Sequence, residues 1–150
     1  MAGQATIKIG DREWLVDVAT QPWELSQGLG GLSGLLTGIG MLFDLGWEQI
    51  IEVTTVPMLF PLDIAFFSED MTITELYRNV EPGYIVTSQS PARYFLEVSA
   101  GELADIEASS QAEVSLLFME NAAAASNWTP VLFGFMGLMM MAVFMISIVR

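Results

Sequence analysis

The sequence predicts a mostly β domain of the α+β class, a small antiparallel β-barrel-like domain with one or two short helices, followed by a single C-terminal transmembrane α-helix. Two observations predict the β domain. Residues 4–119 consist mainly of short apolar or alternating segments separated by turn residues. Many short strands with few helices are typical of small barrels. The third observation is an uncharged apolar run over residues 130–149, which predicts the membrane span.

The first expected element is a β-hairpin. The segments "ATIKI" (5–9) and "EWLVDVA" (13–19) alternate in polarity and flank Gly10-Asp11-Arg12. The following stretch, 23–43, is apolar and has five glycines between Gly28 and Gly38. Glycine disfavours a helix interior. We therefore expect a short helix and a glycine-rich turn here, leading into a strand at 40–43.

The rest of the domain is predicted from runs of β-branched and aromatic residues. A short helix is expected at 99–107, capped by Ser99 or Gly101. Strands are expected at 49–55, 62–67, 72–80, 84–88, 94–98 and 112–119.

The C-terminal run, Pro130 to Val149, has twenty residues without a charge. At about 1.5 Å per residue it would extend about 30 Å, the hydrocarbon thickness of a bilayer. Pro130 suits the first helical position, Trp128 the membrane interface, and Arg150 the opposite headgroups.

Gly134 and Gly137 would allow this helix to approach another closely. The expected organisation is a β-rich domain at 1–119, a linker at 120–128 and a membrane helix at 129–150. This arrangement is that of a single-pass, tail-anchored membrane protein. The default orientation places the domain in the cytoplasm, whereas the single basic residue Arg150 argues weakly for the reverse, so orientation stays open.

Composition excludes several kinds of chemistry. The chain has 18 acidic and 5 basic residues and a net charge of −13, which disfavours nucleic-acid binding. Cysteine and histidine are absent, so disulfides, thiolate or imidazole metal sites and Ser-His-Asp catalysis are excluded. We therefore predict no catalytic residue, no cofactor-binding residue and no metal site, and expect a protein that is not an enzyme.

Four motifs together resemble a known family. They are Gln27-Gly28-Leu29, Gly40-Met41-Leu42-Phe43, Pro61-Leu62-Asp63-Ile64-Ala65-Phe66, and Pro91-Ala92-Arg93-Tyr94-Phe95-Leu96-Glu97-Val98 with Ala100-Gly101. Their order and spacing resemble the prokaryotic family filed as domain of unknown function 192, over residues 13–118. The resemblance implies a compact, mostly β domain with short helices and no agreed activity.

One stretch departs from that family. Its members typically carry an aromatic-Met-Lys-Asn stretch before Pro-Leu-Asp, where this chain has Thr54-Thr55-Val56-Pro57. An arginine common before Gly-Leu is Gln27 here. If relatives bind a small anionic ligand through those basic groups, the resemblance implies that this chain has lost the ability.

Asp63 and Arg93 are the candidate pair of functional residues, since each stands beside expected core residues. Together they would hold a polar ligand, or Asp63 would act as a general base. The alternative is structural, and we favour it: a buried ion pair that sets strand register, or an aspartate held by backbone amides.

These observations favour a non-catalytic, membrane-anchored accessory or structural subunit of a larger assembly. Its expected partners are other membrane proteins or assembly subunits and the lipid bilayer, contacted through the acidic domain and the Met- and Gly-rich span. One alternative is a membrane-tethered small-ligand-binding or hydrolytic domain that uses Asp63 and Arg93. Another is a structural component of a virion or other membrane-associated particle.

Overall fold

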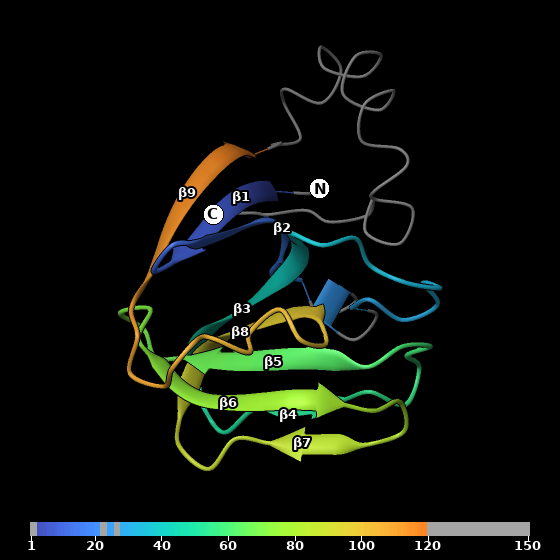
Figure 1. Cartoon of the computed structure of the whole chain (residues 1–150). Helices are drawn as coiled ribbons and strands as arrows, with labels where there is room; N and C mark the ends of the chain where they lie inside the picture. The colour runs from blue at the N-terminus through green and yellow to red at the C-terminus, as the bar shows by residue number, and fades with distance from the viewer. Residues whose placement is uncertain (1–2, 22–23, 26–27, 120–150) are drawn as a thin grey trace.

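The computed structural model describes residues 3–21, 24–25 and 28–119 of the chain. A seven-stranded, strongly twisted sheet has the order β6-β5-β8-β3-β2-β1-β9, and β4 pairs with β7 in a second, two-stranded sheet (Figure 1). The strands are β1 Gly3–Ile9, β2 Arg12–Ala19, β3 Ile39–Gln49, β4 Glu52–Thr54, β5 Leu62–Phe67, β6 Ile73–Val80, β7 Ile85–Thr87, β8 Ala92–Ser99 and β9 Ala112–Met119. The mostly β class is therefore confirmed.

The predicted N-terminal hairpin is confirmed. Strands β1 and β2 pair antiparallel from Gly3↔Val18 to Ile9↔Arg12. Gly10 has a φ of 59° in the connecting turn, a conformation that glycine adopts without steric cost. Alternation sets the two faces of β1, because Ile7 is buried and the next residue, Lys8, is exposed.

The all-antiparallel expectation is wrong at the centre of the sheet. Strands β2 and β3 are parallel, with Leu15 opposite Ile39 and Ala19 opposite Phe43. A parallel pair needs a long crossover, and residues 20–38, which include the glycine-rich stretch, provide it. The two strands' side-chain patterns carry no information on relative direction, so this pairing was not predictable from them.

The expected closed barrel is also absent from the described part of the chain. The sheet is open, and β6 and β9 are its two edges (Figure 1). One isolated bridge, Thr72↔Gln111, joins the segments just before these strands. No ladder extends from that bridge. Closure would need matched stagger along both edge strands, and here the bridge joins only the residues that precede them.

The helix predicted at 99–107 is a series of turns. Its backbone bonds join residues three apart, from the Glu102 amide to the Ser99 carbonyl and from the Ala104 amide to the Gly101 carbonyl. Gly101 has a φ of 95°, outside the helical region. Within the described residues after β2, helical geometry is confined to 24–25.

The seven-stranded sheet buries side chains on both faces. One face carries Trp14, Val16, Leu42, Leu96 and Phe67, all in the core. The other carries Phe43 and Phe95, whose rings stack with centroids 4.1 Å apart. The β4–β7 sheet and the segments before β3 and after β4 lie against this second face, and the candidate site is formed there.

The predicted membrane helix lies outside the described residues, together with the linker and the residues assigned to the anchor: Trp128, Pro130, Gly134, Gly137 and Arg150. In residues 3–21, 24–25 and 28–119, no helix has the length and apolar character needed to cross a membrane.

Candidate functional site

Asp63 is a structural anchor in this fold. Its side chain is fully buried in β5, and its carboxyl oxygens accept three backbone hydrogen bonds. Oδ1 accepts from the Asn79 amide at 2.8 Å, and Oδ2 accepts from the Gly101 and Leu103 amides at 2.9 Å each. Charge-assisted bonds of this kind are strong. Asp63 therefore ties β6 and the turns after β8 to β5.

Arg78 on β6 binds the same turns after β8. Its Nε donates to the Leu103 carbonyl at 3.0 Å, and its NH2 group donates to the Ile106 carbonyl. The turns thus give amides to an acid and carbonyls to a base. Sequence reasoning did not identify Arg78, because its partners are backbone atoms far along the chain.

Arg93, at the start of β8, forms a different set of contacts. Its guanidinium bonds both carboxyl oxygens of Asp44, with the Nε to Oδ1 distance 3.0 Å. Its NH1 group contacts Glu69 Oε1 at 2.9 Å. Asp44 is buried and Glu69 is exposed, so Arg93 joins a core carboxyl group to the surface.

The structure does not bring Asp63 and Arg93 together. In the antiparallel β5–β8 ladder, Asp63 lies opposite Val98, whereas Arg93 precedes Tyr94, which lies opposite Phe67. The two residues therefore stand at opposite ends of the ladder. Each has structural partners of its own, and neither faces a shared ligand site.

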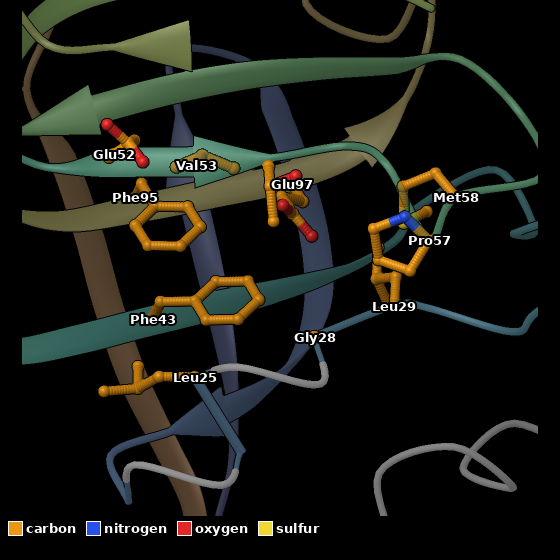
Figure 2. Close-up of a pocket in the computed structure, with 11 residues that line it drawn as sticks. Leu25, Gly28, Leu29, Phe43, Glu52, Val53, Pro57, Met58, Phe95 and Glu97 are labelled. Carbon is orange, nitrogen blue, oxygen red and sulfur yellow. The ribbon is translucent and has the colours of Figure 1, made fainter. Parts of the chain in front are cut away.

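A cavity of about 210 Å³ lies between the second sheet face and the β4–β7 layer. Phe43 and Phe95 form one wall and β4 residues 52–54 form another. The cavity is completed by Leu25, Gly28, Leu29, Pro57 and Met58 (Figure 2). Most of the lining is apolar. Two carboxyl groups, those of Glu52 and Glu97, are the ionisable groups among its lining residues.

Glu97 is the unusual residue of this cavity. Figure 2 shows its carboxyl group extending from β8 among Val53, Phe95 and Pro57. The residue is 4% exposed, and its Oε2 has no hydrogen-bond partner among the described residues. Burial raises the pKa of Glu97 to about 8, so the side chain is largely protonated at neutral pH.

Glu97 belongs to a row of residues that crosses the sheet. Register places Glu97 opposite Met41, Met41 opposite Asp17, and Asp17 opposite Gln4. Burial raises the pKa of Asp17 to about 7, and a 3.3 Å hydrogen bond from Gln4 Nε2 opposes that rise. Asp17 thus has a polar side-chain partner in the row, whereas Glu97 has apolar Met41 and Ile64 opposite it.

Gly28 keeps the space next to Glu97 open. A Cβ atom on Gly28 would lie 3.3 Å from Phe43 Cζ and 3.7 Å from Glu97 Oε2. Its φ of 49° also suits glycine better than a residue with a side chain. The neighbouring residue, Gln27, which replaces the arginine common in relatives, lies outside the described residues.

The altered stretch Thr54-Thr55-Val56-Pro57 forms part of the cavity wall. Thr54 and Pro57 line the cavity. Thr55 is fully buried, and its Oγ1 donates to the Glu81 carbonyl at 2.7 Å and accepts from the Tyr84 amide at 2.9 Å. The stretch that the sequence predicted to be an erased anion site therefore joins two turns beside a cavity whose buried acidic group is Glu97.

The side chains of the cavity can form hydrogen bonds or an ion pair with a small molecule, and they do not resemble a metal centre. No cluster of three or more metal-ligating side chains occurs among the described residues. The hydroxyl of Thr54 accepts a hydrogen bond from the Val56 amide at 3.2 Å. A protonated Glu97 can donate a hydrogen bond, and an ionised Glu97 can neutralise a cation.

Sequence reasoning missed Glu97 as a site residue, although a signal was present. Asp63 was selected because it is an acid inside an apolar strand, and Glu97 in "YFLEV" satisfies the same criterion. Strand β8 is buried on both faces over 95–98. An acid in such a strand has no solvent-facing position to occupy.

The fold and the motifs agree with a known family. The model of the family DUF192, described as an uncharacterized ACR, matches residues 5–116. The chain belongs to the DUF192 family. The predicted resemblance is thereby confirmed for the domain, and the C-terminal segment after residue 116 lies outside the match. Comparison with curated proteins found no similar sequence.

Two solved structures share the fold. One, described as a candidate transcription regulator from Sinorhizobium meliloti 1021, is 25% identical with a TM-score of 0.67, covering 77% of this chain and 94% of its own. The other, a protein of unknown function from Novosphingobium aromaticivorans DSM 12444, is 20% identical with a TM-score of 0.67, covering 75% and 84%. The DUF192 domain of this chain thus has the architecture of these bacterial proteins.

Proposed function

We propose that this DUF192 domain is a non-catalytic domain that binds a small organic molecule in the cavity at Glu97. One observation carries the proposal: a buried carboxyl oxygen lines a cavity and has no hydrogen-bond partner among the described residues. Leaving such a group unsatisfied costs about 1–3 kcal/mol. A ligand that supplies the missing partner would recover that cost, whereas an apolar side chain at position 97 would avoid it without creating a site.

The cavity limits the size of the ligand. Its volume of about 210 Å³ is larger than the engineered apolar cavity of about 150 Å³ that binds benzene. We therefore expect a ligand of roughly six to ten non-hydrogen atoms. The apolar walls would cover most of its surface, and Glu97 would orient its polar group.

Filling the cavity tests this function. Val53 lies in the cavity wall and is buried, so Val53→Phe should occupy the ligand space. Ligand-observed NMR with a library of small fragments should find binders to the wild-type chain that Val53→Phe no longer binds. Val114→Phe on β9, which is partly exposed and away from the cavity lining, is the matched control and should keep them.

The proposal would be overturned if no fragment bound the wild-type chain, or if Val53→Phe bound the same fragments equally well. Thermal unfolding of both variants should accompany the screen. A folded Val53→Phe protein is required for the comparison. Glu97→Met, in which methionine is nearly the same size as glutamate, is a second variant of the same cavity.

We further propose that residues 129–150 hold this domain at a lipid bilayer. The support is the uncharged run from Pro130 to Val149, which has the length of a membrane span. Deleting residues 128–150 should move the protein from the membrane pellet to the supernatant after carbonate extraction. Continued sedimentation of the truncated chain with membranes would contradict this role.

A second candidate function is an accessory or structural subunit of a larger assembly, such as a membrane complex or a membrane-associated particle like a virion. Large apolar side chains favour it, since Val56, Leu59, Tyr84 and Ile85 are all exposed on or beside the β4–β7 sheet. Exposed apolar groups of this kind mark contact surfaces when they are contiguous. Purification in mild detergent should recover stoichiometric partners, and recovery as a lone monomer would count against it.

A further inference from the structure

The ionisable side chains that line the cavity are all acidic. The lining contains the carboxyl groups of Glu52 and Glu97, and no lysine or arginine is among its residues. The chain as a whole carries a net charge of −13, which adds a negative potential. An anionic ligand would therefore meet two acids and no base. A cationic ligand would meet one acid at the exposed edge and one at the buried end.

The position of Glu97 sets the geometry of recognition. Oε2 is buried, has no hydrogen-bond partner among the described residues, and lies close to Gly28, where the missing side chain leaves room. A carboxylate accepts hydrogen bonds only. It would therefore be satisfied by a group that brings both N–H donors and positive charge, as an ammonium group does. A quaternary ammonium lacks the N–H donor and would leave the oxygen unbonded.

We propose that the Glu97 cavity binds a small primary or secondary organic amine in its ammonium form, with the nitrogen bonded to Glu97 and the hydrocarbon part packed against Phe43, Phe95 and Val53. This inference rests on the proposed small-molecule-binding function and names the ligand class of that site. Glu52, exposed on β4 at the cavity's edge, attracts the cation during entry.

Binding of the ammonium ion is coupled to release of a proton. Free Glu97 is largely protonated at neutral pH, and a bound cation favours its ionised form. Each binding event at neutral pH therefore expels close to one proton, the one leaving the Glu97 carboxyl group. Affinity for the amine rises with pH until Glu97 is ionised in the free protein.

The charged and titratable groups around Glu97 belong to several elements. Glu52 faces the cavity from β4, and Asp17 lies two strands away in the same row, beyond Met41. Glu24 carries a buried carboxyl group before the cavity segment and accepts hydrogen bonds from the Thr20 and Gln21 amides. From β5, the residue opposite Glu97 is the apolar Ile64. All three neighbouring groups are acids, so their ionisation also favours a bound cation.

Three probes of matched shape separate the ligand classes. Benzylamine is a cation at neutral pH, benzyl alcohol is neutral and benzoate is an anion. Calorimetric titration of the full-length chain in mild detergent should show benzylamine binding about ten- to a hundredfold more tightly than benzyl alcohol, with no binding of benzoate. The benzylamine enthalpy should vary with the buffer's ionisation enthalpy by close to one proton per site at pH 6.5.

Variants assign the effect to Glu97. Glu97→Gln should lose most of the benzylamine affinity and its buffer dependence, yet still bind benzyl alcohol. Glu52→Gln, the control acid at the edge, should keep the proton release and lose only a small part of the affinity. Because all proteins are measured in the same detergent, partition of the probes into micelles cancels in the comparison.

Failure of the ammonium inference is distinguishable from failure of the proposed function. If benzyl alcohol or benzoate binds wild type as tightly as benzylamine, or if Glu97→Gln binds benzylamine unchanged, small molecules bind without recognition of an ammonium group by Glu97, and the ammonium inference is overturned. If none of the three probes binds the folded wild-type chain, the ammonium inference is overturned, and the proposed binding function is overturned as well only if the fragment library also yields no binder.

Discussion

Asp63 and Glu97 are two acids buried in adjacent strands of one sheet, and they differ in their hydrogen-bond partners. Asp63 accepts three backbone amides from β6 and from the turns after β8. Glu97 has an oxygen with no partner among the described residues. A buried acid with complete hydrogen bonding stabilises its fold, whereas one without costs free energy. The first is therefore a structural residue, and the second lies in the cavity for which we propose ligand binding.

Removing the charge of Asp63 should have the largest effect on stability. Asp63→Asn replaces one accepting oxygen by an amide group that faces backbone donors. We expect the free energy of unfolding to fall by about 3–5 kcal/mol, measured by urea denaturation. Asp105→Asn, at an exposed acid that pairs with Arg12, is the control and should change little. A small effect of Asp63→Asn on the free energy of unfolding would contradict the structural role of Asp63.

For Glu97 we expect the opposite change, an increase in the free energy of unfolding. Glu97→Met keeps the side chain's size and removes the unsatisfied carboxyl group. The free energy of unfolding at pH 7 should rise by about 1–3 kcal/mol, while ligand binding in the cavity is lost. Glu13→Met, at an exposed acid on β2, is the matched control. A marked loss of stability in Glu97→Met would show that Glu97 has a structural partner after all.

The pH dependence of stability should sharpen the comparison. Glu97 has a pKa of about 8 in the fold and an ordinary value of 4.5. Between these values the native state holds a proton that the unfolded chain has released. The free energy of unfolding should therefore fall as pH rises from about 4.5 to 8, by at most about 1.4 kcal/mol per pH unit from this group.

Asp17 should also lower the free energy of unfolding as pH rises, over a lower pH range, because burial raises its pKa from 3.8 to about 7. Urea denaturation of wild type and Glu97→Met at several pH values separates the two acids. The variant should lose the part of the slope that lies between about pH 7 and 8. An unchanged slope there would mean that Glu97 does not titrate in this range.

Arg93 gives an intermediate case, in which a buried acid is paired with a charge. Arg93→Gln removes the guanidinium from Asp44 and should lower the free energy of unfolding by about 1–2 kcal/mol. Glu69→Gln breaks the exposed half of the same network and should cost less than about 0.5 kcal/mol. Equal effects of the two substitutions would show that the pairing of buried Asp44 has no special weight.

Local patterns were sufficient to locate most of the strands. Segments 62–67 and 112–119 were predicted with the bounds of β5 and β9, and the hairpin was predicted nearly as it is. The helix at 99–107 was predicted from composition and failed because Gly101 adopts a positive φ and Asp63 holds the amides of this segment. Those interactions come from distant parts of the chain, so a local pattern cannot contain them.

By itself, the sequence determined the β class, the hairpin, the family motifs and the presence of two acids inside apolar strands. Only the tertiary structure decided the strand order, the parallel β2–β3 pair, the open sheet and the partners of each acid. The reason is distance along the chain. Side-chain alternation is a property of neighbouring residues. The amides that bind Asp63 belong to Asn79, Gly101 and Leu103, which are 16, 38 and 40 positions away along the chain. Which buried carboxyl oxygens are left without a partner depends on the assembled fold.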